Sequence, residues 1–422
     1  MVNYTKQQIT HIKHQALIAA QHHNAVMLLD NNFCVNAFGL HQIEFAAAFG
    51  VSDYISVNQN SFDALEKFVA KHQHTYVFTQ LSYDLKNQLE KLQSNHPNHI
   101  GFDDLIAFVP EQLLVIDAQG NCVFGDEVAQ QLLHQQLTLT DVPHQPINVQ
   151  AKVNKEQYLS DVEHIRQHIL EGDVYELNYC TEFYHTNARI NPYQVYDKLK
   201  CKSPVPFGAF FKWDKKYLLC ASPERFITKL GDKVYSQPIK GTTPRSANEV
   251  EDEAQKQHLL NSEKERAENL MIVDLVRNDL ARTAQTGTVV VDELFGIYSF
   301  KQVHQMISTV SAKTKQEVSG VEVIKNAFPM GSMTGAPKIM AMKLIEQYEQ
   351  TQRGLYSGAV GYFAPNGNFD LNVVIRSLQF NAQTNYLSFE VGSAITYDSQ
   401  GEQEYEECLL KASAMVNVLL GE

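Results

Sequence analysis

The sequence predicts an α+β fold of two large packed antiparallel sheets with helices on the outside. Strand-like segments cluster along the chain, and helix-like segments separate the clusters. That order favours antiparallel sheets over a doubly wound parallel sheet. The chain has 422 residues, 44% of them hydrophobic, which is enough to bury one large core or two ordinary ones.

The first third of the chain mixes short apolar runs with Gln, Asn and His. The stretch Thr138–Val149 carries Pro143 and Pro146, which is typical of a connection between subdomains. We therefore expect residues 1–145 to form an N-terminal subdomain of the same sandwich and residues 146–422 to carry the functional site. Strands are predicted in the first part at Ala25–Leu29, Thr75–Phe78 and Gln112–Ile116.

The second part begins with a clear helix pattern over Lys155–Glu171, which Gly172 ends. A long charged helix is predicted over Ala247–Arg282, where Ser262 and Glu265 have capping-box spacing. Shorter helices are predicted at Val321–Ala327, Pro337–Glu349 and Gln403–Leu420. Strands are predicted at Val174–Phe183, Phe207–Trp213, Tyr217–Ala221, Arg225–Lys229, Lys233–Ile239, Thr288–Tyr298, Val303–Ser311, Tyr356–Phe363, Asp370–Phe380 and Leu387–Val391.

Composition excludes several classes of protein. A net charge of -13 argues against a nucleic-acid or anionic-membrane partner. The N-terminus does not resemble a signal peptide, and no apolar run reaches the roughly 20 residues that span a bilayer. The cysteines form no CxxC pair, so we expect reduced core thiols in a cytoplasmic protein. These six are Cys34, Cys122, Cys180, Cys201, Cys220 and Cys408.

Two predicted helices carry acidic faces. Glu265 and Glu268 are three residues apart on one, while Glu404 and Glu407 are three apart on another and Lys411 follows four residues later. Such spacings share a helix face. Two opposed faces of this kind would need a cation, and magnesium prefers oxygen ligands. The spacing alone also fits solvated glutamates in helix salt bridges.

A lysine stands at the end of a predicted strand in Pro238-Ile239-Lys240-Gly241-Thr242-Thr243-Pro244-Arg245. If Lys240 is buried near a cation, we expect its pKa to fall and its amine to become a nucleophile. The alternative is a solvated lysine in a turn.

Three further segments suit an anionic ligand. The segment Gly331–Lys338 precedes a predicted helix, whose N-terminal N–H groups attract anions. Small residues at Gly392–Ala394 are predicted to form a turn after a strand, which lets backbone N–H groups approach a carboxylate. Arg376 is predicted inside an apolar strand and needs an anionic partner, either a ligand or a protein acid.

Taken in order, these segments resemble the chorismate-utilising enzymes, a family that includes anthranilate, aminodeoxychorismate, isochorismate and salicylate synthases. The resemblance runs from about Ile169 to Met415 and is weaker before it, mainly at Leu81–Leu85. It rests on Ser222–Phe226, the Pro-Ile-Lys-Gly-Thr segment, Glu268–Asp279, the Gly-Ser-Met-Thr-Gly-Ala-Pro-Lys segment, Gly358–Tyr362 and Glu404–Lys411.

The resemblance implies that a magnesium ion holds the ring carboxylate of chorismate. Glu268 and Glu407 match its direct ligands, and Glu265 and Glu404 match supporting acids. Residues that match contacts to the enolpyruvyl carboxylate side are Tyr356, Arg376, Gly392, Ser393 and Ala394. Further substrate contacts match Gly241, Thr242, Thr334 and Lys411.

Position 240 separates branches of the family. Relatives of the 4-aminobenzoate branch carry lysine there, and anthranilate synthases resemble Pro-Ile-Ala-Gly-Thr instead. The resemblance implies that Lys240 attacks C2 and that ammonia then attacks C4. Glu224 matches the acid that protonates the leaving hydroxyl, and we expect burial to raise its pKa. An anthranilate synthase component and a non-catalytic paralogue that binds chorismate or a glutaminase remain alternatives.

Three residues depart from the family pattern. Glu176 stands where amidating relatives usually have glutamine and isochorismate synthases have a lysine base. Gln305 replaces a frequent histidine, and Ala394 replaces a glycine. The chain lacks the Gly-x-Cys-x-Gly elbow of a glutaminase. The resemblance therefore implies a separate glutamine amidotransferase subunit and a downstream aminodeoxychorismate lyase.

Overall fold

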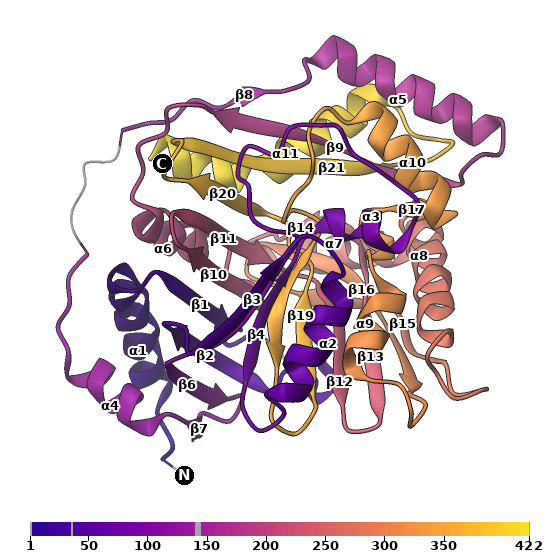
Figure 1. Cartoon of the computed structure of the whole chain (residues 1–422). Coiled ribbons are helices and arrows are strands. Elements are labelled where there is room, and N and C mark those ends of the chain that lie inside the picture. The colour runs from indigo at the N-terminus through magenta and orange to yellow at the C-terminus, as the bar shows by residue number, and fades with distance from the viewer. Residues whose placement is uncertain (1, 35–36, 140–144, 422) are drawn as a thin grey trace.

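The computed structural model describes residues 2–34, 37–139 and 145–421. It contains one 11-stranded and one 10-stranded sheet, and every recorded strand pair is antiparallel. Helices lie on the outside of the sheets (Figure 1). The predicted α+β fold is confirmed. Part of the expected connection at Thr138–Val149, residues 140–144, lies outside the described residues.

The first sheet has the strand order β17-β9-β21-β20-β11-β10-β1-β2-β6-β7, and β8 pairs with β9. It therefore combines strands from both ends of the chain. The strands are β1 (Ala25–Asp30), β2 (Ile43–Phe49), β6 (Gln112–Asp117), β7 (Cys122–Phe124), β8 (Gln150–Ala151), β9 (Glu176–His185), β10 (Phe207–Trp213), β11 (Lys216–Ser222), β17 (Gly335–Ala336), β20 (Ser377–Asn381) and β21 (Tyr386–Ile395).

The second sheet has the order β14-β16-β13-β12-β19-β18-β4-β5-β3, and β15 pairs with β16. Residues before 145 thus supply strands to both sheets. The strands are β3 (Asp53–Val57), β4 (Val77–Leu81), β5 (Leu105–Val109), β12 (Arg225–Leu230), β13 (Lys233–Gln237), β14 (Ile239–Pro244), β15 (Val290–Ser299), β16 (Val303–Lys313), β18 (Ala359–Phe363) and β19 (Phe369–Asn372).

The predicted helix over 247–282 is two helices, because Ser262 ends one and caps the next by accepting from the Glu265 N–H. Across the described residues, no helix has both the length and the apolar content needed to cross a bilayer. The helices are α1 (Lys6–Ala19), α2 (Ser61–Lys71), α3 (Lys86–Leu89), α4 (Asp126–His134), α5 (Lys155–Leu170), α6 (Pro192–Lys202), α7 (Glu249–Asn261), α8 (Glu263–Ala281), α9 (Gly320–Ala327), α10 (Lys338–Tyr348) and α11 (Gly401–Leu420).

Side-chain alternation divides the core into layers. In β2, Phe45 and Ala47 pack in the cluster under the helices, whereas Ala46 and Ala48 pack in the cluster shared by the two sheets. This is the period of two that a strand imposes. The cysteines are all free, but Cys201 is exposed and Cys34 is half-buried, so the expectation of six core thiols is wrong for these two.

Candidate active site

Two crossings of the chain between the sheets bring candidate residues together. Pro223 and Glu224 connect β11 of the first sheet to β12 of the second, and residues 373–376 lead from β19 back to β20. The N–H of Val373 donates to the Glu224 carbonyl at 3.0 Å, so the crossings touch. Glu224 and Arg376 therefore lie where the two sheets meet.

Arg376 lies between two strands and not inside one, which corrects the sequence-based expectation. The apolar run 370–380 changes sheets midway, and Arg376 at the crossing has a φ of 50°, in the left-handed region. Burial lowers the pKa of Arg376, and Glu224 opposes that effect. Within the described residues the guanidinium forms no ion pair within 4.0 Å, so an anionic ligand is the partner that its chemistry suits.

Glu224 is buried, with 4% exposure, and burial raises its pKa to about 7, as expected. A hydrogen bond from Ser332 and the nearby charges of Lys240 and Arg376 oppose the rise. Beside it lies a cavity of about 20 Å³, lined also by Ser332 and Asp279, which is room for one water molecule. Glu224 is thus a carboxyl group that can keep its proton near neutral pH.

Lys240 lies on β14, and its Nζ donates to Glu176 Oε1 at 2.7 Å. The side chains are 11% and 1% exposed. Burial alone would lower the pKa of Lys240, but the carboxylates of Glu176, Glu268 and Glu224 outweigh burial and raise it. The expected fall in pKa is therefore wrong for the protein without a bound cation, because that expectation assumed a neighbouring positive charge.

Gly241 lets strand β14 approach the acidic helix α8. Its φ is 89°, and a Cβ there would lie 3.0 Å from both Glu265 Oε2 and the Leu259 side chain. A glycine thus tolerates both the backbone conformation and the close approach. The neighbouring Thr242 is exposed and pairs in register with Gln305 of β16.

The acidic faces of α8 and α11 meet across a lysine. The Nζ of Lys264 lies 3.9 Å from Glu268 Oε1 and 3.6 Å from Glu404 Oε1, which joins the two helices. On α11, Lys411 pairs with Glu407 at 2.7 Å, which helps to lower the Glu407 pKa against the effect of burial. Burial raises the pKa of Glu265, and Glu407 adds to the rise.

These glutamates fit a divalent cation by their chemistry. Glu268 is 9% exposed, burial raises its pKa to about 7, and its Oε1 is buried without a hydrogen-bond partner. Such an oxygen needs a cation or a proton. The Lys264 ammonium, 3.9 Å from this oxygen, is a weak substitute for such a cation. Among the described residues, three ligand atoms within 4.8 Å occur at the surface cluster His168, Glu171 and Asp173 and not among these glutamates.

The segment Gly392–Ala394 is part of strand β21 and not a turn, so that expectation is wrong. It pairs with β9, with Gly392 opposite Cys180 and Ala394 opposite Asn178. The close approach of β9 requires small residues here, because a Cβ on Gly392 would lie 2.4 Å from the Tyr179 carbonyl. In the sequence, the same small residues are also compatible with a turn.

The side chains around this segment are largely engaged. The Ser393 hydroxyl lies 3.2 Å from the Tyr158 hydroxyl, under helix α5, and Lys411 donates to the Gly392 carbonyl at 2.9 Å. The Thr334 hydroxyl donates to the Met330 carbonyl at 3.1 Å. The Tyr356 hydroxyl is buried 3.7 Å from the Cys180 sulfur. Because their polar side-chain atoms are engaged, these residues shape the site chiefly through their backbone groups and side-chain volume.

Three contributions escaped the sequence analysis. The ion pair of Glu176 with Lys240 joins residues 64 positions apart, which no local pattern reveals. Ser332 hydrogen-bonds Glu224, but in the sequence it was only one residue of the Gly331–Lys338 segment and had no role of its own. Lys264 could have been found, because it lies four residues before Glu268 on one helix face.

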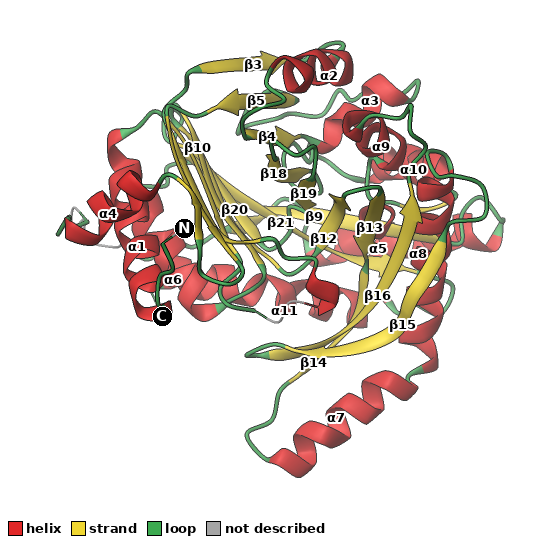
Figure 2. Cartoon of the chain, turned by 90° about the horizontal axis from the view of Figure 1, so that it is seen from below, coloured by secondary structure: helices red, strands yellow, loops and turns green. Residues whose placement is uncertain are grey.

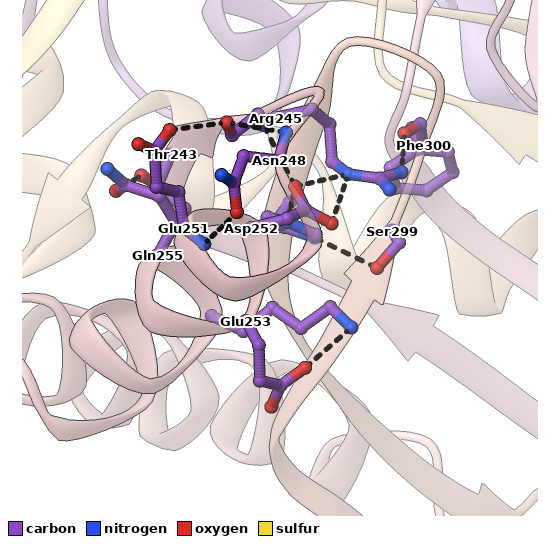
Figure 3. Close-up of polar contacts among 12 residues, drawn as sticks. Thr243, Arg245, Asn248, Glu251, Asp252, Glu253, Gln255, Ser299 and Phe300 are labelled. Atoms are coloured by element: carbon purple, nitrogen blue, oxygen red, sulfur yellow. Dashed lines mark hydrogen bonds and ion pairs between the residues drawn. The ribbon is translucent and has the colours of Figure 1, made fainter.

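A polar network holds the far end of β14 (Figure 3). Arg245 donates to Asp252 at 2.8 Å and to the Phe300 carbonyl at 2.9 Å. His304 lies 2.9 Å from the same aspartate, and Ser299 lies 2.8 Å from His304. The network ties α7 to β14, β15 and β16, at the end of the molecule where α7 projects in Figure 2.

The chain belongs to the family of chorismate binding enzymes, whose model matches residues 25–417. Aminodeoxychorismate synthase component 1 of Escherichia coli is 34% identical over 343 residues, which cover 80% of this chain and 75% of that one. Aminodeoxychorismate synthase of Streptomyces griseus is 41% identical over 274 residues, 64% of this chain. The chain spans only 37% of the length of that relative and 29% of the chloroplastic Arabidopsis thaliana enzyme.

Solved structures agree with the fold. Anthranilate synthase component I from Streptococcus pneumoniae superposes with a TM-score of 0.76 at 25% identity, covering 88% of this chain and 91% of that one. The menaquinone-specific isochorismate synthase of Escherichia coli has the same TM-score at 16% identity, which speaks for the fold alone.

A separate cavity of about 340 Å³ between α2 and α9 contains none of the candidate residues.

Proposed function

We propose that this protein aminates chorismate at C4, with magnesium and with ammonia from a partner glutaminase. The product is 4-amino-4-deoxychorismate, the precursor of 4-aminobenzoate in folate synthesis. One observation carries the proposal: a buried amine, Lys240, and a carboxyl group that can stay protonated, Glu224, occupy one site. The names of the bacterial and plant relatives support it.

The two residues divide the chemistry. The neutral amine of Lys240 attacks C2 of the ring, while Glu224 gives its proton to the C4 hydroxyl, which leaves as water. Ammonia then attacks C4, and the bond between C2 and the lysine nitrogen breaks. Without an amine at position 240, ammonia would attack C2 and lead toward the 2-amino product.

The remaining candidates hold the substrate. Arg376 binds the enolpyruvyl carboxylate side, together with Tyr356 and the strand segment Gly392–Ala394. The carboxylates of Glu268 and Glu407 would hold magnesium directly, with Glu265 and Glu404 in support. When bound, magnesium would fix the ring carboxylate and neutralise the two acidic faces. Further contacts come from Gly241, Thr242, Thr334 and Lys411.

The protein works with partners. Some relatives are named component 1, which fits a two-component enzyme, and this chain lacks the cysteine elbow of a glutaminase. A glutamine amidotransferase therefore supplies ammonia, and a lyase releases pyruvate from the product afterwards. Residues 146–422 form the chorismate-binding catalytic region, since the candidates lie between positions 176 and 411. The free thiols support a cytoplasmic location.

Mass spectrometry of the product made from chorismate, ammonium and magnesium tests the proposal. We expect 4-amino-4-deoxychorismate from the wild type, released as 4-aminobenzoate and pyruvate only when a lyase is added. Fluorescent 2-aminobenzoate with pyruvate, formed without a lyase, would identify an anthranilate synthase instead. Calorimetry that finds partner binding but no magnesium-dependent chorismate binding would point to a non-catalytic paralogue.

A further inference from the structure

Glu176 is a carboxylate in direct contact with the amine of Lys240. It begins strand β9 and is 1% exposed, and its Oε1 accepts from Nζ at 2.7 Å. Its other oxygen, Oε2, is buried and has no hydrogen-bond partner in the described structure. The carboxylate is therefore buried, the amine is slightly exposed, and one carboxylate oxygen is left without a hydrogen bond.

The protonation of Lys240 limits the proposed reaction. An ammonium group has no lone pair and cannot attack a ring carbon. In the protein without a bound cation, Nζ donates to Glu176 and the surrounding carboxylates raise the pKa of Lys240 against the effect of burial, so the proton stays on nitrogen. A nucleophilic lysine here needs a nearby group that removes this proton inside the site.

We propose that Glu176 is the base that takes this proton from Lys240 once chorismate is bound. The inference rests on the proposed function and adds a residue to it. One N–H bond of Nζ breaks, an O–H bond forms on Oε1, and the freed electron pair forms the bond to C2. When the lysine leaves the ring as a neutral amine, Glu176 returns the proton.

The transfer costs no net charge, which is why a buried pair can perform it. Burial disfavours both an ammonium and a carboxylate, so excluding water favours the neutral pair of amine and carboxylic acid. A substrate that covers the site increases that effect. The buried Oε2 has no hydrogen-bond donor, so Lys240 is the one described side chain that donates to this carboxylate.

A second buried acid differs from Glu176, because both of its carboxylate oxygens accept hydrogen bonds. Glu349 pairs with Arg353 through both oxygens and also accepts from the Cys180 N–H at 2.9 Å. Its charge is fully satisfied by a guanidinium that does not give up its proton. Glu349 holds structure together, whereas Glu176 is half satisfied and faces an amine that can be deprotonated.

Other charges around Lys240 are too remote to replace Glu176 as the acceptor. No other described residue accepts a hydrogen bond from Nζ. They act on Lys240 through space and come from each element packed around it: Glu265 and Glu268 of α8, Glu407 of α11, and Glu224 at the β11–β12 crossing.

The test follows the half-reaction without ammonia. Full-length protein is mixed with chorismate and magnesium, and intact-mass spectrometry follows the covalent adduct, which carries chorismate minus water. We expect Glu176→Gln to form the adduct about 100-fold more slowly near pH 7, the usual loss when a general base is removed. Glu176→Asp, which keeps a base, should recover part of the rate.

The ratio of wild-type to Glu176→Gln rates at each pH separates a base from a structural residue. In the variant, the carboxylates of Glu268 and Glu224 still favour the ammonium form of Lys240. Lys240 must then lose its proton to solvent, so the ratio should fall by up to tenfold for each unit of rising pH. Glu224 loses its proton in both proteins, so its effect on the rate cancels in the ratio. Glu182→Gln is the matched control, since Glu182 is a buried acid of the same strand bonded to Tyr386 and remote from Lys240.

A Glu176→Gln protein that forms the adduct at the wild-type rate and with the wild-type pH dependence would overturn the inference. A ratio that is large but constant with pH would also overturn it, since that is the effect of misplacing Lys240. The proposed function fails differently: the wild type would then form neither adduct nor 4-amino-4-deoxychorismate, or Lys240→Ala would still make the product.

Discussion

The two sides of the candidate site differ in how completely the protein builds them. On the strand side, Lys240 and Glu176 meet at 2.7 Å and are 11% and 1% exposed. On the helix side, Lys264 bridges Glu268 and Glu404 at 3.9 and 3.6 Å, and its own side chain is 49% exposed. One side is preformed, and the other is held together loosely by a surface cation.

The architecture explains the difference. Glu176 is held by the pairing of β9 with β17, where it lies opposite Ala336. Lys240 lies at a register shift between β14 and β16, and its side chain is held by the ion pair with Glu176. Helix α8 packs on β14 and β16, whereas α11 packs on β21 of the other sheet. The carboxylates of the two helices repel one another, and a cation or a proton relieves that repulsion. Four variants or conditions test this contrast.

The largest effect is expected on the preformed side, from Glu224→Gln. Loss of the acid should reduce kcat for amination by about 10²- to 10⁴-fold. In the wild type the activity should decline above about pH 7, because Glu224 then loses the proton it must donate. The hydrogen bond from Ser332 lowers the Glu224 pKa, so Ser332→Ala should move this decline to higher pH. A decline at the same pH in Glu224→Gln would exclude Glu224 as its source.

On the loosely held side, Glu268→Gln should weaken magnesium-dependent chorismate binding by about 10- to 100-fold, measured by titration calorimetry. Without magnesium, chorismate binding should be almost the same in the variant and the wild type, because Glu268 then has no cation through which to hold the substrate. Glu263→Gln, an exposed acid of the same helix, is the control. Equal losses in both variants would mean that general charge and not a ligand position is responsible.

Stability without magnesium should fall as pH rises from about 5 to about 8. Burial raises the pKa of Glu224 and Glu268 to about 7, so the folded state binds more protons than the unfolded state in this range. The unfolding free energy therefore decreases with pH, by an expected few degrees in Tm. Magnesium should raise Tm more at about pH 8 than at about pH 5. A Tm that rises over this range would refute the assignment of buried, uncompensated carboxylates.

The smallest effect is expected for Lys264→Gln. At the proposed metal site, Lys264 would compete with magnesium for Glu268 and Glu404. Its removal should therefore tighten magnesium binding about two- to fivefold, which corresponds to a weak surface ion pair. Magnesium titration followed by calorimetry measures it. Weaker binding in the variant would show that Lys264 supports the site and does not merely substitute for the cation.

The sequence predicts the sheets and the acidic helix faces well, because both depend on local periodicity. Strand β10 and helix α5 fall within a residue of their predicted bounds. The raised pKa of Glu224, which burial causes, agrees with the expectation that came from the family resemblance.

Properties that depend on distant contacts could not be predicted. The run 370–380 has one apolar pattern but crosses between sheets at Arg376, and nothing in the pattern marks that point. The small residues at Gly392–Ala394 fit a turn as well as a closely packed strand. The raised pKa of Lys240 depends on Glu176, which approaches it only in the folded chain.

Peptide mapping of the adduct tests the central claim most directly. Wild-type protein is incubated with chorismate and magnesium in the absence of ammonia, digested and analysed by mass spectrometry. The account predicts one modification, chorismate minus water, on the peptide and residue Lys240. A protein that makes 4-amino-4-deoxychorismate when ammonia is supplied, but carries the modification on another residue or on none, would contradict it.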